Sequence, residues 1–270
     1  MSFLQIILQI LDVKMQTPDM YGWFHLLSLG LTALLTAVLC FAARRHGERE
    51  SVRRVVLVVT LLVVALEIYK QINYSFSYTD GIKFDYQWYI FPFQFCSTPM
   101  YVGLLAGLTK KGKVHDAACA YLATYAMFAG LCVMAYPDTV FVQTVGINIQ
   151  TMVCHGTMIV IGIYLLYSGY VKIEIKTLLR GALIFAILVS MAAVMNEVAF
   201  QAGLLETEDF NMFFISPHCD PSLPVYSLVQ QHVPYPWCLI IYILGFSLAA
   251  YLILLLAMLT KKLAKESQTV

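Results

Sequence analysis

Charged residues are scarce in this sequence: they make up 12% of its 270 residues, while apolar residues make up 60%. A soluble domain usually carries about 25% charged residues. This scarcity excludes an ordinary water-soluble protein and indicates that lipid surrounds most of the chain. The sequence also has no Walker motif, no dinucleotide-binding motif and no basic nucleic-acid-binding patch. We therefore expect no nucleic-acid partner and no cofactor.

Cysteine is sparse in the predicted loops. Six of the seven cysteines lie in or beside apolar stretches, and only Cys219 lies in a long connection. That placement excludes a disulfide framework. The opening residues, MSFLQIILQILDVK, lack the basic n-region of a signal peptide, and their apolar run is too short to span a membrane. We expect a short interfacial helix there.

Long apolar runs, in contrast, are abundant. Seven of them approach the roughly 20 residues that a membrane-spanning helix needs. They lie near residues 22–43, 55–72, 87–108, 115–135, 147–168, 178–201 and 235–260. The sequence therefore predicts an all-α, polytopic membrane helix bundle with seven transmembrane helices, forming a single transmembrane domain over residues 1–270.

The basic residues alternate between the two sides of these spans. Fourteen of the seventeen lie in four segments, which are 44–54, 109–114, 169–180 and the C-terminal tail. The intervening connections contain only Lys14 and Lys83. Because lysine and arginine mark cytoplasmic loops, we predict that the N-terminus lies outside and the C-terminus lies in the cytoplasm.

The outer loop 202–234 is the one long connection, and it is acidic and rich in proline. His218, Cys219, Asp220 and His232 within it raise the idea of a metal site, but their spacing matches no standard zinc pattern. We predict no metal there and interpret the loop as a cap or lid over the outer face of the bundle.

Two polar residues stand out inside the predicted spans. Cys96 lies between two prolines in the stretch FPFQFCSTPMY, residues 91–101, and His155 lies in the fifth span. At 1.5 Å per helical residue, both lie roughly 12–14 Å below the outer ends of their helices. Polar groups at such depth normally face the interior of a bundle and mark function. The matched depths predict that Cys96 and His155 face one shared interior.

Simpler interpretations stay open beside this one. A membrane cysteine is more commonly a small apolar filler, and a single histidine such as His155 commonly bridges two helices by a hydrogen bond. Glu67 and Lys70 have the spacing of a helical ion pair. Small residues and prolines recur along the third span, at Pro92, Cys96, Pro99, Gly103 and Gly107, and predict one helical stripe that contacts another helix.

A cysteine beside a histidine can act as a nucleophile, because the imidazole accepts the thiol proton. Attack of the Cys96 thiolate on a lipid ester would give an acyl-thioester, with His155 as the base. Glu67, Asn196 or Glu197 would orient the imidazole. Donors to the oxyanion would be the side chains of Gln94 or Ser97, or backbone N–H groups.

Three short motifs resemble a known family. FPFQFCSTPMY, CHGTMIVIGIYLL at 154–166 and YPWCLIIYI at 235–243 are similar to the YwaF-like integral membrane proteins, which have a Pro-x-His-x-Cys segment, a later His-Gly and a Pro-Trp before the last span. That family looks related to the vertebrate transmembrane acyltransferase that remodels ether phospholipids. The resemblance implies that Cys96 accepts the acyl group and that His155 is the His-Gly histidine.

The sequence departs from this pattern at Gln94, where the family has a histidine. Glutamine cannot act as a general base, so a mechanism with two histidines is excluded. We expect a cysteine-dependent phospholipid acyltransferase or lipid hydrolase, integral to a bacterial cell membrane, with a membrane phospholipid or lysophospholipid as substrate. The alternative is a small-solute transporter or ligand-binding membrane protein whose outward-facing polar cavity is lined by Glu67, His155 and Glu197. The oligomeric state stays open.

Overall fold

The structure is a computed structural model that describes residues 3–46, 49–78, 81–203, 210–220 and 223–266. Parts of the segment 44–54 and of the loop 202–234 lie outside these ranges. The elements in order are α1 (Phe3–Leu11), α2 (Trp23–His46), α3 (Arg49–Asn73), β1 (Phe76–Ser77), β2 (Lys83–Phe84), η1 (Trp88–Ile90), α4 (Thr98–Leu108), α5 (Lys113–Tyr121), η2 (Leu122–Ala126), α6 (Met127–Ala135), α7 (Val145–Tyr167), α8 (Ile175–Gln201), η3 (Met212–Phe214), α9 (Pro224–His232) and α10 (Tyr235–Glu266).

The predicted all-α, polytopic membrane architecture is confirmed. Within the described ranges, six helices are long and apolar enough to cross a membrane: α2, α3, the continuous helix Lys113–Ala135, α7, α8 and α10. Their outward faces carry exposed leucines, such as Leu34 on α2 and Leu248 on α10, which suit contact with lipid chains. The expected short N-terminal helix corresponds to α1, whereas a seventh span and the orientation in the membrane stay predictions.

The third predicted span is not a continuous helix. Residues 87–108 contain the short helix η1, an irregular turn over residues 91–97, and then α4. Two prolines explain the break, since the residue before a proline avoids the α conformation and a proline lacks an N–H donor. Pro99 lies in the first turn of α4, where helices tolerate a missing donor. The hydroxyl of Thr98 donates to the Phe95 carbonyl at 3.0 Å in its place.

This turn changes which residues share a helical face. Pro92 and Cys96 lie before α4, so the predicted stripe that joined them to Gly103 and Gly107 is wrong in its first half. The two glycines do share a face that packs against α3, where a Cβ at Gly107 would lie only 2.8 Å from the Leu57 Cβ. The predicted contact through small residues is confirmed there.

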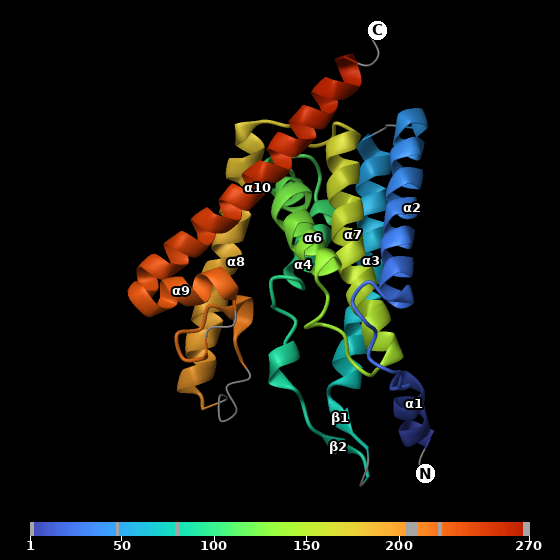
Figure 1. Ribbon diagram of the computed structural model, residues 1–270, viewed down its shortest axis with the longest axis vertical. Helices are drawn as coiled ribbons and strands as arrows, with labels where there is room; N and C mark the ends of the chain where they lie inside the picture. The colour runs from blue at the N-terminus through green and yellow to red at the C-terminus, as the bar shows by residue number, and fades with distance from the viewer. Residues whose placement is uncertain (1–2, 47–48, 79–80, 204–209, 221–222, 267–270) are drawn as a thin grey trace.

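The helices pack around the continuous helix α5–η2–α6 and around α7. α7 packs against α2, α3 and α6, while α8 packs against α5 and α10. In Figure 1, α2 and α3 lie beside α7, and α10 crosses α8 obliquely. η2 is one turn of π-helix that joins α5 to α6. Tyr121 and Tyr125 on this central helix are completely buried, so it forms the middle of the core.

The two ends of the bundle differ in composition. At one end α2, α4 and α7 finish and α3, α5 and α8 begin; we call it the basic end, because it carries the lysine-rich segments 109–114 and 169–180. The opposite end, here called the hairpin end, carries α1 and the antiparallel β1–β2 hairpin (Figure 1). Lys14 and Thr144 form an isolated β-bridge at that end.

Asp12 connects α1 to the rest of the hairpin end. Its carboxylate accepts hydrogen bonds from Lys14 at 2.7 Å, from Thr144 at 2.9 Å and from the Tyr78 hydroxyl. Burial alone would raise the pKa of Asp12, but these three hydrogen bonds outweigh it and hold that pKa below its usual 3.8. The bond to Asp12, aided by burial, raises the pKa of Tyr78 to about 12. Tyr69 adds a hydrogen bond from its hydroxyl to the Leu11 carbonyl at 2.6 Å.

Candidate functional site

Cys96 lies in the irregular turn over residues 91–97 and is partly buried. It lines an interior cavity of about 20 Å³ together with Thr60, Pro99, Leu122, Cys154 and Met158. A cavity of that size holds about one water molecule. The thiol therefore faces interior space on a non-helical backbone, but this space cannot hold a lipid in the present arrangement.

His155 lies on α7, on a different face from the residues that line this cavity. Cys154, Met158 and Ile161 represent α7 in the cavity wall. The His155 ring is buried, and its Nδ1 lies 2.7 Å from the Thr151 carbonyl oxygen. Its Nε2 has no hydrogen-bond partner among the described residues. The structure thus brings Cys96 and Cys154 to one cavity and forms no hydrogen bond between Cys96 and His155.

Glu67 belongs to a buried polar network in α3 and α7. Its carboxylate forms an ion pair with Lys70 at 2.9 Å and lies 3.5 Å from the side-chain nitrogen of Gln150. Gln150 in turn donates to the Cys154 sulfur at 3.3 Å. The ion pair expected from the spacing of Glu67 and Lys70 is confirmed.

Gln94 and Asn196 bind backbone rather than the predicted catalytic groups. Gln94 accepts a hydrogen bond from the Phe213 N–H at 3.0 Å and donates to the Asn211 carbonyl at 3.0 Å. Asn196 binds both backbone groups of Met212, at 2.7 and 3.0 Å. Phe213 has a φ of 59° and is fully buried. The two amides therefore hold a strained segment of the outer loop in place.

Glu197 and Ser97 lie in separate surroundings. The Glu197 carboxylate lies 2.8 Å from the His218 ring nitrogen, and this ring stacks on Phe200 with centroids 3.6 Å apart. Ser97 is buried beside Cys96 at the start of α4. The three groups of the transport hypothesis therefore have different partners: Lys70 for Glu67, the Thr151 carbonyl for His155 and His218 for Glu197.

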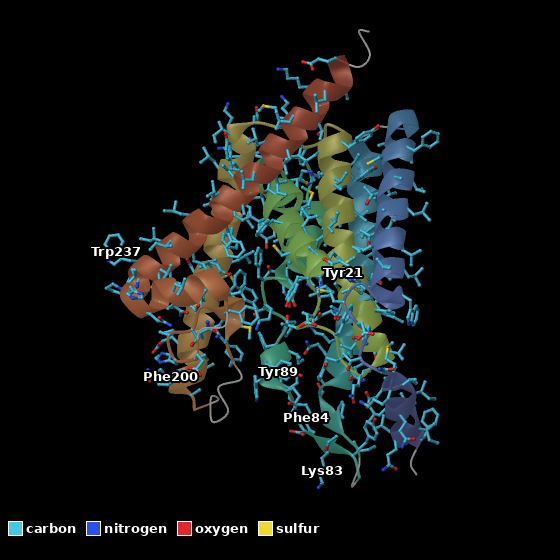
Figure 2. All side chains as sticks on the ribbon, in the orientation of Figure 1. Tyr21, Lys83, Phe84, Tyr89, Phe200 and Trp237 are labelled. Atoms are coloured by element: carbon cyan, nitrogen blue, oxygen red, sulfur yellow. The ribbon has the colours of Figure 1, made fainter. Side chains whose placement is uncertain are left out.

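A second, larger hollow lies on the other side of Met100. It has a volume of about 360 Å³ and is lined by Val64, Glu67, Ile68, Gln71, Pro92 and Tyr101. Ile68 and Tyr101 are 56% and 41% exposed, so this groove opens on the lipid-facing side of α3 and α4. Phe84 of the hairpin also lines the groove, and Figure 2 shows where this residue lies at the hairpin end. Met100 lines both the groove and the Cys96 cavity, so the two spaces adjoin at this side chain.

Three residues of this site were not predicted from the sequence: Gln150, Cys154 and Met100. Cys154 directly precedes His155, and its spacing of four from Gln150 on one helix predicts their contact. Met100 could not be found, because its role depends on where the helical part of the third span begins.

Comparison with known proteins identifies the family of this chain. A family model described as the TMEM164 family matches residues 20–259, which is most of the chain. No curated protein and no solved structure matches it. The family match does not support the YwaF-like name specifically, and a bacterial membrane stays a prediction. Together with the six long apolar helices, it supports an integral membrane protein. The chain belongs to the TMEM164 family.

Proposed function

We propose that this protein is a phospholipid acyltransferase or lipid hydrolase that carries the acyl group as a thioester on Cys96. The observation that carries the proposal is the position of this thiol. It lies on a non-helical backbone inside the bundle, and Met100 lines both its cavity and a groove on the lipid-facing surface. Irregular backbone at membrane depth is tolerated only where protein or a cavity surrounds it.

The groove beyond Met100 suits a lipid substrate. Its lining is mainly apolar, with Glu67 and Gln71 as polar groups, so an acyl chain and the ester region of a phospholipid can both find matching surroundings. Methionine is unbranched and has three rotatable bonds, so it repacks at little cost. Rotation of the Met100 side chain would join the groove to the cavity and bring an ester carbonyl to the thiol.

The reaction has two steps. The Cys96 thiolate attacks the ester carbonyl, a carbon–sulfur bond forms, and the carbon–oxygen bond breaks as the lysolipid oxygen leaves and takes up a proton. The hydroxyl of a lysolipid, or water in a hydrolase, then attacks the thioester and returns the thiol. Ser97 or nearby backbone N–H groups donate to the oxyanion. Gln94 is not proposed for this role, because both ends of its amide already bind the outer loop.

His155 is the proposed base, since its Nε2 is buried and has no partner within the described part of the chain. No hydrogen bond joins it to Cys96 in this arrangement, so proton transfer requires a bridging water molecule or a change of side-chain conformation. The small cavity beside the thiol has the volume for one water, but His155 does not line it, so the imidazole must also move toward this cavity. The Glu67 carboxylate pairs with Lys70 at 2.9 Å rather than with the imidazole.

Trapping the acyl group tests this proposal. The full chain, reconstituted in phosphatidylcholine vesicles, is expected to gain the mass of one acyl group that hydroxylamine releases. Peptide mapping should place that group on Cys96. Cys154→Ala serves as the matched control, because this thiol lines the same cavity. An adduct that persists in Cys96→Ala, or that maps to Cys154, would overturn the assignment of the nucleophile.

A further inference from the structure

Two adjacent cavities lie at the basic end, and Cys96 lines neither of them. The first has a volume of about 500 Å³ and is lined by Leu166, Ile173, Met258, Lys261 and Lys262. The second has a volume of about 330 Å³ and is lined by Lys111, Asp116, Cys119, Tyr170, Lys176 and Arg180. Val171, Lys172 and Glu174 line both. We call the two together the Lys172 cavities.

Basic side chains outnumber acidic ones around these cavities. Of the basic residues that line them, Arg180 forms an ion pair with Asp116 at 3.4 Å and Lys262 one with Glu266 at 3.9 Å. Within the described ranges, the other lining lysines, Lys111, Lys172, Lys176 and Lys261, form no ion pair. Glu174 also lines both cavities and offsets part of this charge, yet six basic residues stand against two acidic ones in the lining, which favours an anionic occupant.

A buried histidine lies directly behind the second cavity. His115 is only 2% exposed, and its Nε2 lies 2.6 Å from the Tyr170 hydroxyl and 3.6 Å from the Cys119 sulfur, both of which belong to cavity-lining residues. Its Nδ1 is buried and has no partner among the described residues. A buried polar atom without a partner is costly and indicates a missing water or ligand.

The same histidine lies in the first turn of α5, which adds a second attraction for anions. The N-cap residue Gly112 provides no side-chain cap, so backbone N–H groups of this turn lack that partner. Helix N-termini attract phosphate through these N–H groups and through the helix dipole. An anion near Lys111 would thus meet lysine side chains and the start of α5.

The surroundings of the cavities are apolar and face lipid. Leu166, Ile173 and Met258 line the first cavity, and on the neighbouring surfaces of α8 and α10 Leu179 is 62% and Leu259 45% exposed. Free phosphate would use only the charged part of such a site, whereas a lipid would use both parts. We propose that the Lys172 cavities bind the phosphate-bearing head group of an anionic membrane phospholipid, with its glycerol region against Leu166 and Met258. This site does not depend on the chemistry proposed for Cys96.

Selective lipid retention tests this proposal. The full chain, purified in detergent, is incubated with equal amounts of dioleoylphosphatidylglycerol and dioleoylphosphatidylcholine, and the bound lipid is weighed by native mass spectrometry. We expect preferential retention of phosphatidylglycerol. Lys172→Gln should weaken it about fivefold, the effect of one basic residue near an anionic lipid. The matched control is Lys83→Gln, because this exposed lysine lies at the hairpin end (Figure 2) and its loss should change nothing.

Other results would overturn the proposal. Equal retention of the two lipids excludes a site selective for anionic head groups. Equal affinity in Lys172→Gln and Lys83→Gln excludes the Lys172 cavities. In a separate experiment, inorganic phosphate replaces the lipid. If phosphate binds as tightly as phosphatidylglycerol and this binding depends on Lys172, the site is one for a soluble anion. If Lys172→Gln unfolds at a lower temperature than the parent, Lys261→Gln, which alters only the first cavity, replaces it and must show the same loss of selectivity.

Discussion

At the hairpin end of this bundle, polar side chains form hydrogen bonds with backbone groups of the protein itself. At the basic end, lysine side chains line open cavities instead. Gln94 and Asn196 satisfy backbone groups of the outer loop around the strained Phe213. Lys172 and Lys176 line hollows and form no ion pair in the described ranges. The polar groups are thus satisfied within the fold at one end, whereas at the other the charged groups face open space.

The two ends also contain contrasting cysteine–histidine pairs. Cys96 and His155 come from different elements, and their similar depth did not place them in hydrogen-bond contact. Cys119 and His115 lie four residues apart on one helix and are 3.6 Å apart. Spacing within a helix determines the shared face, whereas depth on two helices leaves the rotation of each helix open.

The largest expected effect tests whether the chemistry belongs to the hairpin end. Cys96→Ala removes the proposed nucleophile and should lower acyl transfer about a thousandfold or more. The measurement is transfer of a labelled acyl chain between phospholipid and lysophospholipid in proteoliposomes. Cys132→Ala is the control, because this thiol is exposed on α6 and its variant should keep full activity. Full activity of Cys96→Ala would show that Cys96 is not the nucleophile and that the contrast between the two ends does not concern catalysis.

The second effect separates the two histidines. His155→Gln should lower the rate of acyl transfer about a hundredfold, as expected for loss of a general base. It should also flatten the pH profile of the rate. His115→Gln should instead lower the free energy of unfolding by about 1 kcal/mol, through its lost bond to Tyr170. His232→Gln is the control for both assays, because the His232 ring lies 2.9 Å from the Leu228 carbonyl oxygen of the same helix, α9. A loss of activity in His115→Gln as large as in His155→Gln would show that the two ends share one function.

A third change weakens the hairpin end directly. Gln94→Ala would leave the Phe213 N–H without its partner at a buried, strained position. The expected loss in free energy of unfolding is about 1–3 kcal/mol, with faster hydrogen exchange of amides in residues 210–216. Gln201→Ala removes a glutamine whose bond to Glu197 is exposed and should leave both quantities unchanged. Unaltered exchange in Gln94→Ala would contradict the role of this amide as a clamp.

The smallest effect concerns pH at the hairpin end. Because the pKa of Asp12 is lower in the folded protein than in the unfolded chain, its stabilisation is complete above the unfolded pKa of about 4 and is lost as the pH falls through the lowered value. Below about pH 4, amides of α1 should therefore exchange faster with solvent. Asp12→Asn should remove most of this pH dependence. Equal acid sensitivity in both proteins would assign it to other carboxylates.

The sequence predicted the long helices well and the candidate site less well. Apolar runs alone located the six long helices, because hydrocarbon requires continuous apolar surface with internal hydrogen bonds. The depth and facing of Cys96 were estimated as if residues 87–108 formed one helix. The prolines prevent that helix, so the rotation of Cys96 relative to α7 could not be obtained by counting residues.

The basic end shows a different limit. Lysines such as Lys172 were interpreted as topology signals, and that interpretation gave no reason to look for a cavity around them. The contact between His115 and Cys119 could have been predicted from their spacing. The first cavity depends on where the last part of α10 lies against the segment 169–174, and the second on how α5 and α8 pack against that segment. No local pattern in the sequence contains those arrangements.

The π-helical turn η2 has a consequence for the length of the chain. A π turn holds one residue more than an α turn, and each helical residue adds a rotation of about 100°. Because this turn takes up its extra residue within one rotation, deletion of one residue from Leu122–Ala126 would restore a regular helix and leave the facing of α6 nearly unchanged. Gly130, whose added Cβ would lie only 2.6 Å from the His155 carbonyl oxygen, would then stay against α7. A deletion in the regular part of α5 would instead turn α6 by about 100° and bring a side chain to that contact.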